Sequence, residues 1–220
     1  MAPERSAFTP AQLRVIDRAR SPFAVQQYLN GLKYNTESAG PTLRSFRGVV
    51  AHKTAQCLEG ALSAATILEQ HGYPPLLLDL ESWDNLDHVL FVYRKRGKWG
   101  TVGRSRDPGL HGRKPVFSTL RQLVDSYANP YIDYEGRIIG FGLCDLRDLG
   151  GYDWRLSPRN VWKVQRVLID MPHQKYHMAN ARYEYWYARY CAYKARFADR
   201  KPVYYPGRRT WTAGYPKGKP

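Results

Sequence analysis

The chain has few cysteines, few acidic residues relative to its basic ones, and no long apolar run. Its 220 residues include 3 cysteines, whose odd number and wide spacing argue against a disulfide framework and against a zinc site of the Cys-x-x-Cys kind. No stretch approaches about eighteen consecutive apolar residues, and no apolar signal-peptide core lies near the N-terminus. We therefore expect a cytoplasmic protein with reduced thiols and no membrane association.

Signatures of nucleotide, cofactor and metal binding are also missing. There is no GxxxxGK[ST] phosphate loop, and the Gly-rich stretch at residues 140–151 does not lead into a predicted helix. His173 and His177 have the i, i+4 spacing of metal ligands on a helix, but no third ligand of suitable type is evident near them. We predict no cofactor and no metal.

Positive charge is concentrated in the last third of the chain. The net charge of +15 divides into +4 over residues 1–150, which hold 19 Lys or Arg and 15 Asp or Glu, and +11 over residues 151–220, which hold 15 and 4. Such a region suits acidic surfaces, anionic substrates or nucleic acid. Because a hydrophobic content of 43% is sufficient for a sizeable core, we expect a folded body with a basic C-terminal region.

One cysteine lies near the start of a predicted helix. Residues 54–72 place apolar side chains at helical spacing, with Thr54 suited to the N-cap and Gly72 to a left-handed stop. Cys57 then falls in the first turn, where the helix dipole favours an anion and the thiol ionises more easily. Its N–H would be a donor without an intrahelical acceptor, available to an oxyanion. Taken alone, Cys57 also suits a small buried position.

A histidine opens an apolar strand about thirty residues later. His88 begins the run HVLFVYR, and residues 95–97 separate this run from KWGTVGRS, a spacing that favours an antiparallel hairpin. A cysteine nucleophile needs an imidazole within hydrogen-bond reach. A strand packed across the start of the cysteine helix would bring His88 to Cys57.

These segments resemble the catalytic core of the transglutaminase-like superfamily, whose members carry Cys on a helix and His and Asp on adjacent strands in a papain-like arrangement. The matching segments are TAQCLEGALSAA, HGYPPLLLDL, DHVLFVY and WGTVGRSRDP, and the resemblance runs roughly from residue 43 to residue 127. It implies acyl transfer through a thioester on a protein or peptide-like substrate, with Cys57 as nucleophile and His88 as general base and then acid. Hydrolysis and transamidation are both open.

The sequence leaves two candidates for the group that orients His88. In the family pattern an acid follows a Trp by about four residues, but the position four after Trp99 is Gly103. In an extended strand Ser105 and Asp107 share the face of Gly103, because side chains alternate. A carboxylate stabilises an imidazolium better than a hydroxyl does, so we prefer Asp107 and keep Ser105 as the alternative. Asp107 also suits the first position of an Asp-Pro-Gly turn.

Four further residues are predicted to contact substrate. Gln56, next to the nucleophile, would add a donor to an oxyanion. Trp99 belongs to a segment that carries the resemblance. Arg104 and Arg106 would flank the mouth of the site, where they either select an anionic substrate or form a solvated rim.

The order of predicted elements, a helix followed by antiparallel strands, indicates an α+β fold with a papain-like or transglutaminase-like core. We divide the chain into an N-terminal helical segment at residues 1–42, a catalytic domain at residues 43–150, and a basic, Tyr-rich helical extension and tail at residues 151–220. Capping, turn and periodicity signals predict these further elements: helices that start at Thr9-Pro10, Ser21-Pro22, Ser118 and Ser157-Pro158, a buried strand in YPPLLLDL, and a second hairpin over residues 131–143.

Aromatic residues form a regular seam near the C-terminus. Tyr176, Tyr183, Tyr190 and Phe197 recur every seven residues, and such a stripe more often packs as core than faces a partner. The alternative to an enzyme is a weak or inactive scaffold whose residues 151–220 bind nucleic acid or an acidic partner through basic and aromatic side chains. The oligomeric state stays open.

Overall fold

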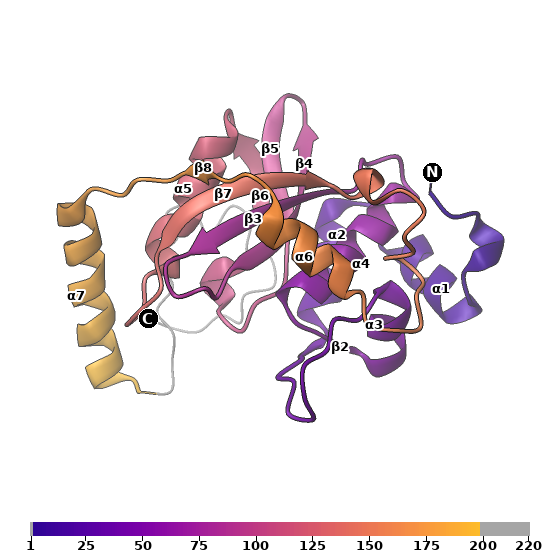
Figure 1. Cartoon of the computed structure of the whole chain (residues 1–220), viewed down its shortest axis with the longest axis horizontal. Helices are drawn as coiled ribbons and strands as arrows, with labels where there is room; N and C mark the ends of the chain where they lie inside the picture. The colour runs from indigo at the N-terminus through magenta and orange to yellow at the C-terminus, as the bar shows by residue number, and fades with distance from the viewer. Residues whose placement is uncertain (1, 199–220) are drawn as a thin grey trace.

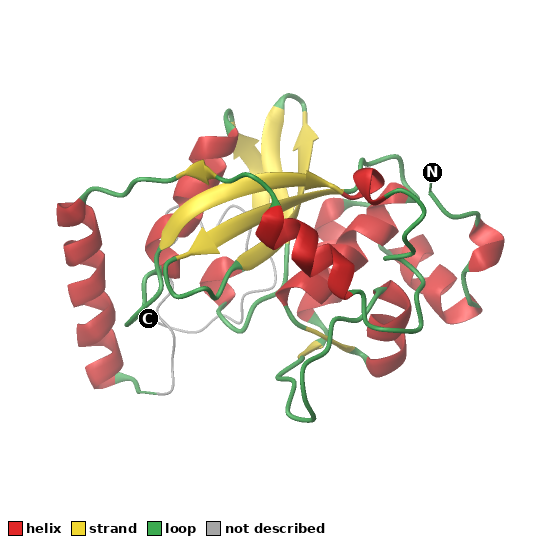
Figure 2. Ribbon diagram, in the orientation of Figure 1, coloured by secondary structure: helices red, strands yellow, loops and turns green. Residues whose placement is uncertain are grey.

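The computed structural model describes residues 2–198 and shows an α+β fold. Its centre is an antiparallel sheet with the strand order β6-β5-β4-β3-β7-β8 and helices on both faces (Figures 1 and 2). The predicted fold class is confirmed. The strands are β1 (Lys33–Tyr34), β2 (Thr54–Ala55), β3 (Leu76–Ser82), β4 (His88–Lys95), β5 (Lys98–Val102), β6 (Arg113–Phe117), β7 (Ile138–Asp145) and β8 (Gln174–Lys175), of which β1 and β2 form a separate parallel pair.

Helices make up most of the remaining regular structure. No helix within residues 2–198 combines the length and the apolar character that crossing a membrane requires. The α-helices are α1 (Pro10–Arg18), α2 (Pro22–Asn30), α3 (Phe46–His52), α4 (Cys57–Glu69), α5 (Leu120–Tyr131), α6 (Trp162–Asp170) and α7 (Asn180–Arg196), and short 3₁₀ turns are η1 (Arg5–Ala7), η2 (Pro108–Leu110) and η3 (Leu146–Leu149).

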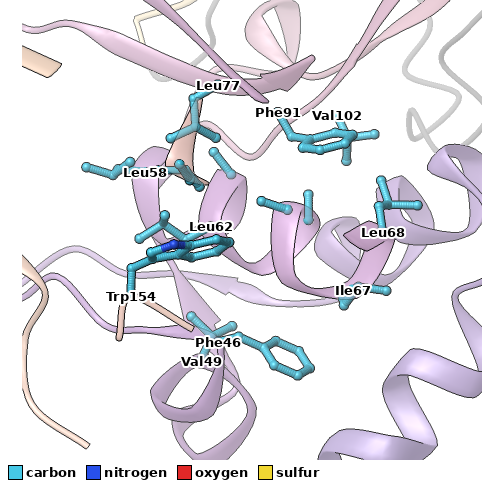
Figure 3. Packing of buried hydrophobic residues seen from close by; sticks show 14 of the residues in the cluster. Phe46, Val49, Leu58, Leu62, Ile67, Leu68, Leu77, Phe91, Val102 and Trp154 are labelled. Carbon is cyan, nitrogen blue, oxygen red and sulfur yellow. The ribbon is translucent and has the colours of Figure 1, made fainter. Parts of the chain in front are cut away.

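Helix α4, which begins with Cys57, is the centre of the larger core. Every residue from Leu58 to Leu68 is buried, as expected for a helix that is apolar all round. Leu62 is fully buried in the same cluster as Trp154, which comes from a distant part of the chain (Figure 3). Burial of one such leucine contributes roughly 1.5–3 kcal/mol. The cysteine helix is therefore fixed in place on several sides.

Each face of the sheet packs in a different hydrophobic cluster. Leu77 of β3 packs in the α4 cluster, whereas Leu78 and Leu80 pack with α5 on the opposite face. This division follows from the period of two in a strand. On β4 the same rule assigns odd-numbered residues to the α4 face and even-numbered residues to the α5 face.

The N-terminal helices start where the capping signals predict. Thr9 forms a capping box with Gln12, and the Ser21 side chain accepts a hydrogen bond from the N–H of Ala24 at 3.3 Å. Residues of α1 and α2, among them Ile16, lie in the same core cluster as α4. These helices thus pack directly against the cysteine helix.

The first predicted hairpin is present. β4 and β5 pair in antiparallel register, and the turn between them contains Arg96 at φ 49° and Gly97 at φ 77°. Two consecutive left-handed residues define the turn that matches the twist of a two-residue hairpin. Glycine is needed here because it adopts positive φ without steric cost.

The second predicted hairpin, over residues 131–143, is wrong. Helix α5 runs through Tyr131. Pro130 lies one residue before the end of the helix, so its missing N–H costs one backbone hydrogen bond in the last turn and does not break the helix. β7 then pairs with the distant strand β3, because its apolar residues complete the middle of the sheet. The predicted cap at Ser118 is also one residue early, since Thr119 is the N-cap.

The predicted helix start at Ser157 is wrong as well. The Ser157 hydroxyl accepts a hydrogen bond from the N–H of Arg159 at 3.1 Å, so it stabilises a local turn in place of a helix. Helix α6 begins four residues after Pro158, at Trp162. It packs through Val164 and Leu168 onto the α4 side of the molecule.

The prediction that the aromatic seam packs as core is wrong for most of α7. Tyr176 is buried but lies before the helix, and Tyr190 is the only buried residue within α7. The helix lies at the opposite end of the molecule from α1 to α3 (Figure 1). An ion pair of 2.6 Å between Arg182 and Asp125 links it to α5. Of the basic extension, residues 199–220 lie outside the described part of the chain.

Candidate active site

Cys57 is the first residue of α4, but the residue that caps the helix is Gln56 and not Thr54. Thr54 and Ala55 are still extended, because they pair with β1. The Gln56 side-chain oxygen accepts from the N–H of Leu58 at 2.7 Å, and the Glu59 carboxylate accepts from the N–H of Gln56 at 3.0 Å. This reciprocal pair is a capping box, and it fixes the first turn on both sides of the sulfur.

The buried carboxylate of Glu59 also ties a neighbouring loop to this turn. Glu59 has 0% exposure and accepts hydrogen bonds from the Asn35 side chain at 3.0 Å and from the N–H of Arg44 at 2.9 Å. A carboxylate with several donors is a strong organising group, because each bond is charge-assisted. The wall of the site around Asn35 is therefore held against the start of α4.

The Cys57 thiol is uncharged at rest. Burial raises the pKa of Cys57 above its usual value, and hydrogen bonds from the backbone N–H groups of Val89 and Leu58 only partly oppose this. The thiol itself donates to the Gln56 side-chain oxygen at 3.3 Å. Desolvation of the sulfur therefore outweighs the opposing effects of these hydrogen bonds and of the helix dipole. A thiolate at neutral pH therefore requires a base.

His88, the first residue of β4, is an uncharged imidazole. It is 3% exposed, and its Nε2 lies 2.7 Å from the carbonyl oxygen of Leu110. A carbonyl only accepts, so Nε2 carries the proton and Nδ1 is free of one in the neutral ring. Burial lowers the pKa of His88 to about 4, although the bond to Leu110 acts in the opposite direction. At neutral pH this imidazole can accept a proton.

Cys57 and His88 line one cavity of about 470 Å³ at the end of the sheet where β4 begins. They reach it from different faces of β4. Val89 faces α4, the helix that Cys57 begins, whereas the His88 ring lies on the α5 face, edge to face with Tyr127 at 6.3 Å between ring centroids. Both residues therefore line the cavity at the start of β4 from opposite faces of that strand, and in the described structure the thiol bonds Gln56 while the imidazole bonds Leu110.

Ser105 and Asp107, the two predicted orienting residues, also line this cavity. The Ser105 hydroxyl accepts from the N–H of Asp107 at 3.0 Å, and the Asp107 carboxylate accepts from the N–H of Gly109 at 2.9 Å, as in the Asp-Pro-Gly turn. The bond at the far nitrogen of His88 goes to the Leu110 carbonyl, which this turn carries. The choice between Ser105 and Asp107 stays a prediction.

The position four residues after Trp99 has no room for an acid. A Cβ on Gly103 would lie 2.2 Å from a methyl carbon of Leu90. The backbone of Gly103 is also held at both ends by Gln26, which accepts from its N–H at 3.0 Å and donates to its carbonyl at 2.9 Å. Packing around Gly103 therefore leaves no room for a side chain at this position.

The predicted substrate-binding residues divide into two pairs. Gln56 and Arg106 line the cavity, and Arg106 is exposed. Trp99 packs on the α5 cluster with the Arg94 guanidinium 5.0 Å from its ring centroid. Arg104 is not among the residues that line the cavity, and it donates to the carbonyls of Ser105 at 2.9 Å and Leu32 at 3.1 Å. Its contacts fasten the loop.

An acidic lining is the main feature that the sequence analysis missed. Among the described residues Arg106 is the one Lys or Arg that lines the cavity, and whether the predicted arginines select an anion or form a solvated rim stays a prediction. One signal was available: Asp79 is a carboxylate inside the apolar strand LLLDL, where a charge is costly unless it has a use. The carboxylates of the lining are Glu37, Asp79, Asp84, Asp87, Asp107 and Asp133.

Within residues 2–198, no group of three or more His, Cys, Asp or Glu side chains has an arrangement that could hold a metal ion. His173 and His177 do not share a helix, because the segment around them forms β8 and an extended connection. His173 instead contacts Asp79 through Nε2 at 3.1 Å. The acidic lining therefore faces the cavity without a metal cluster.

No protein-family model matches the sequence, and no curated protein matches it. Among solved structures the chain is similar to Legionella pneumophila LapG, with 16% sequence identity, coverage of 68% of this chain and 85% of that chain, and a TM-score of 0.39. At this TM-score the likeness assigns neither a family nor an activity.

Proposed function

We propose that the chain is a cysteine-dependent acyl-transfer enzyme that acts on an amide bond of a protein or peptide-like substrate. The observation that carries the proposal is the shared cavity of Cys57 and His88, with the thiol at the N-terminus of α4. A nucleophile and a base next to the unsatisfied N–H groups of a helix start are the parts that acyl transfer needs.

In the proposed reaction, Nδ1 of His88 takes the thiol proton as the Cys57 sulfur attacks the substrate carbonyl carbon. The oxyanion that forms accepts from the Cys57 N–H and from the amide group of Gln56. His88 then returns the proton to the leaving amine, the C–N bond breaks, and a thioester remains. Water or a second amine attacks the thioester and restores the thiol, so the steps are balanced without a cofactor.

The Leu110 carbonyl supports the imidazolium in this scheme. Its oxygen accepts from Nε2 in the resting state, and the bond strengthens when the ring becomes charged. Asp107 or Ser105 adds to this support from the same turn. The low pKa of His88, about 4, ensures that the base is unprotonated before the substrate binds.

The test is an acylation experiment on the full chain with p-nitrophenyl acetate, analysed by site-resolved mass spectrometry. We expect an acetyl adduct on Cys57 that hydroxylamine removes, formed at least tenfold more slowly in His88→Ala. Cys144, 7% exposed with its pKa raised to about 11 by burial, is the internal control. Equal acylation of Cys57 and Cys144 that is indifferent to His88 would refute the proposal.

A second candidate function is single-stranded nucleic-acid binding by α7, which one observation favours. The Arg189 guanidinium lies 5.5 Å from the ring centroid of Tyr185 and 5.6 Å from that of Trp186, and Tyr185 is 56% exposed. Exposed aromatic rings beside a guanidinium suit base stacking with phosphate contact. This activity would be independent of Cys57.

A further inference from the structure

The sign of the charge in the cavity is opposite to that of the protein. The chain carries a net +15, yet within residues 2–198 the cavity beside Cys57 is lined by six carboxylates and one guanidinium. A low-dielectric cleft lined by one sign of charge concentrates ligands of the other sign. The question is whether any of these carboxylates is built to receive a ligand.

Asp79 has an oxygen without a partner. The residue is 1% exposed, Oδ2 accepts from Nε2 of His173 at 3.1 Å, and Oδ1 is buried with no hydrogen bond. Leaving a buried acceptor unsatisfied costs about 1–3 kcal/mol, and more for a charged group. Burial, with the charge of Asp87 nearby, raises the pKa of Asp79 above its usual range. A bound donor would recover this cost.

Asp79 lies next to the reacting sulfur. It pairs with Val89 in the β3–β4 register, lines the same cavity as Cys57, and lies close enough to the sulfur for its charge to help raise the pKa of Cys57. Its odd-numbered position places it on the α4 face of the sheet with Leu77. A group held by the free Asp79 oxygen would therefore lie beside the atom that attacks the substrate.

Gly142, which has no side chain, leaves the space in which His173 lies. Asp79 also pairs with Gly142 of β7, where a Cβ would lie 2.6 Å from the Met171 methyl carbon and 3.3 Å from the His173 ring. Because Gly142 leaves this space, the chain after α6 crosses β7 closely and His173 reaches Asp79. One carboxylate oxygen is thus held by His173, while the other is left without a hydrogen-bond partner in a residue that lines the cavity.

Four other carboxylates of the lining are held in place by backbone groups. None of Glu37, Asp84, Asp87 and Asp133 forms an ion pair with Lys or Arg in the described part of the chain. Each accepts a backbone hydrogen bond instead: Glu37 from Thr42 at 2.8 Å, Asp84 from Leu86 at 3.2 Å, Asp87 from Ser82 at 2.8 Å, and Asp133 from Gly136 at 2.7 Å. Their charge is not neutralised by a partner in the protein.

We propose that the cavity binds an ammonium or guanidinium group of the substrate, which donates to the free oxygen of Asp79 beside Cys57. This deepens the proposed function, because it names the substrate class of the same site. The cation is carried either by the acyl donor, as a Lys or Arg side chain near the scissile amide, or by an amine that accepts the acyl group. The outer carboxylates attract it, and Asp79 fixes its position.

The test compares three methanethiosulfonate reagents that differ in charge: ammonium, neutral methyl and sulfonate. In each case the thiolate attacks the sulfenyl sulfur, a mixed disulfide forms and methanesulfinate leaves. We expect the ratio of ammonium to sulfonate rates at Cys57 to exceed the ratio at Cys191, on the basic helix α7, by at least tenfold. Site-resolved mass spectrometry gives both ratios from one sample.

Asp79→Asn keeps the shape of the side chain and should lower the Cys57 ratio about tenfold. Because the readout is a ratio, a general change in thiol reactivity divides out. Asp148→Asn, exposed on η3 and outside the lining, is the matched control and should keep the wild-type ratio. If Asp79→Asn does not fold, Asp87→Asn is the second variant, with a smaller loss that salt diminishes.

Equal ratios at Cys57 and Cys191 in the wild type would overturn the inference, as would an unchanged ratio in both variants. Failure of the proposed function gives a different result: charge selection with labelling that His88→Ala does not slow. Labelling of Cys57 that depends on His88 but not on the charge of the reagent would refute the cation site and leave the proposed function in place.

The source of the cation is decided by protection of Cys57 from the neutral reagent. Cadaverine represents the amine acceptor, and a blocked peptide amide containing Lys represents the acyl donor, with the Lys→Leu peptide as its control. Protection by cadaverine alone supports the acceptor, and protection by the Lys peptide alone supports the donor. Protection by neither would contradict the proposal.

Discussion

The cavity beside Cys57 and the helix α7 differ in charge, in burial and in how the chain holds them. The cavity is acidic, and its groups come from strands and loops that hydrogen-bond one another. Helix α7 carries Arg182, Arg189, Lys194 and Arg196 against a single Glu184, and it buries only Tyr190. The positive net charge of the chain therefore describes the periphery, and it gives the wrong sign for the site.

Comparison of α4 with α7 also shows that regular spacing of apolar or aromatic residues does not by itself mean that a helix is buried. Both α4 and α7 show apolar or aromatic side chains at helical spacing, but only α4 has neighbours on several sides. In α7 the rings stack largely on one another, as Tyr183 does with Tyr187 at 5.7 Å. Tyrosine rings that recur along one helix can pack against one another, so their regular spacing does not prove contact with a core.

The largest expected effect tests this contrast in stability. Leu62→Ala should lower the free energy of unfolding by about 3 kcal/mol, because it leaves a cavity in a fully packed cluster. Tyr185→Ala, at an exposed position on α7, should change it by less than about 0.5 kcal/mol. Urea unfolding of both variants decides the comparison, and similar losses would mean that α7 is part of the core.

A second effect concerns the turn that supports His88. Arg113 is 1% exposed and donates to the carbonyls of Gly109 at 2.6 Å and His111 at 2.7 Å, on either side of Leu110. Arg113→Lys keeps the charge but loses the planar set of N–H donors of the guanidinium. We therefore expect the free energy of unfolding to fall by about 2 kcal/mol.

The same variant should slow acylation of Cys57, because the Leu110 carbonyl would no longer be fixed against the imidazole. The matched control is Arg94→Lys, an exposed guanidinium over Trp99, for which we expect neither change. A normal acylation rate in a destabilised Arg113→Lys would show that Arg113 supports the fold and not the orientation of His88.

The third effect is a dependence of stability on pH. Burial lowers the pKa values of His88 and His111 to about 4, below the usual value of 6.5. Between these values the unfolded chain binds protons that the two folded-state imidazoles exclude. Their contribution to stability therefore falls as the pH falls from 6.5 to 4 and is constant above 6.5. Each imidazole contributes about 1.4 kcal/mol per pH unit.

His111→Asn should therefore reduce the slope of unfolding free energy against pH by about 1.4 kcal/mol per unit between pH 4.5 and 6. The raised pKa of Asp79 has the opposite sign and is common to both proteins, so it cancels in the difference. His52→Asn, at an exposed position on α3, is the control and should keep the wild-type slope. Equal slopes in the wild type and both variants would mean that water solvates the His111 imidazole in the folded chain.

The parts of the fold that the sequence predicts are those with local causes. The caps at Thr9 and Ser21, the turn at Arg96-Gly97 and the strand that begins at His88 all depend on neighbours within a few residues. The start of α4 was misplaced from Thr54 because β2 is formed by a non-local partner, β1. Contacts across the sequence are the usual reason for such errors.

The candidate site divides in the same way. Cys57, Ser105 and Asp107 were placed in one cavity with His88 by the order and spacing of the segments. The group that bonds the far nitrogen of His88 is a backbone carbonyl, for which no residue type gives a signal. The role of Gly103 depends on Gln26, 77 residues away. The acidity of the cavity arises from loops that only the folded chain brings together.

The smallest expected effect tests whether α7 is a second functional surface. Arg189→Gln removes a charge beside Tyr185 and Trp186 without affecting a buried contact, so the fold should be unchanged. If α7 binds single-stranded RNA, its affinity should fall a few-fold and the slope of log affinity against log salt should become shallower by about 0.7. Fluorescence anisotropy with oligouridine on the full chain measures both. Asp148→Asn, which lies on η3, is the charge-change control. Cys57 acylation should be identical in Arg189→Gln and the wild type, which would show that the two ends of the molecule act separately. A change in both readouts would mean that α7 communicates with the cavity through Tyr190, whose pKa is raised to about 12 by burial and by the nearby charges of Asp133 and Asp107.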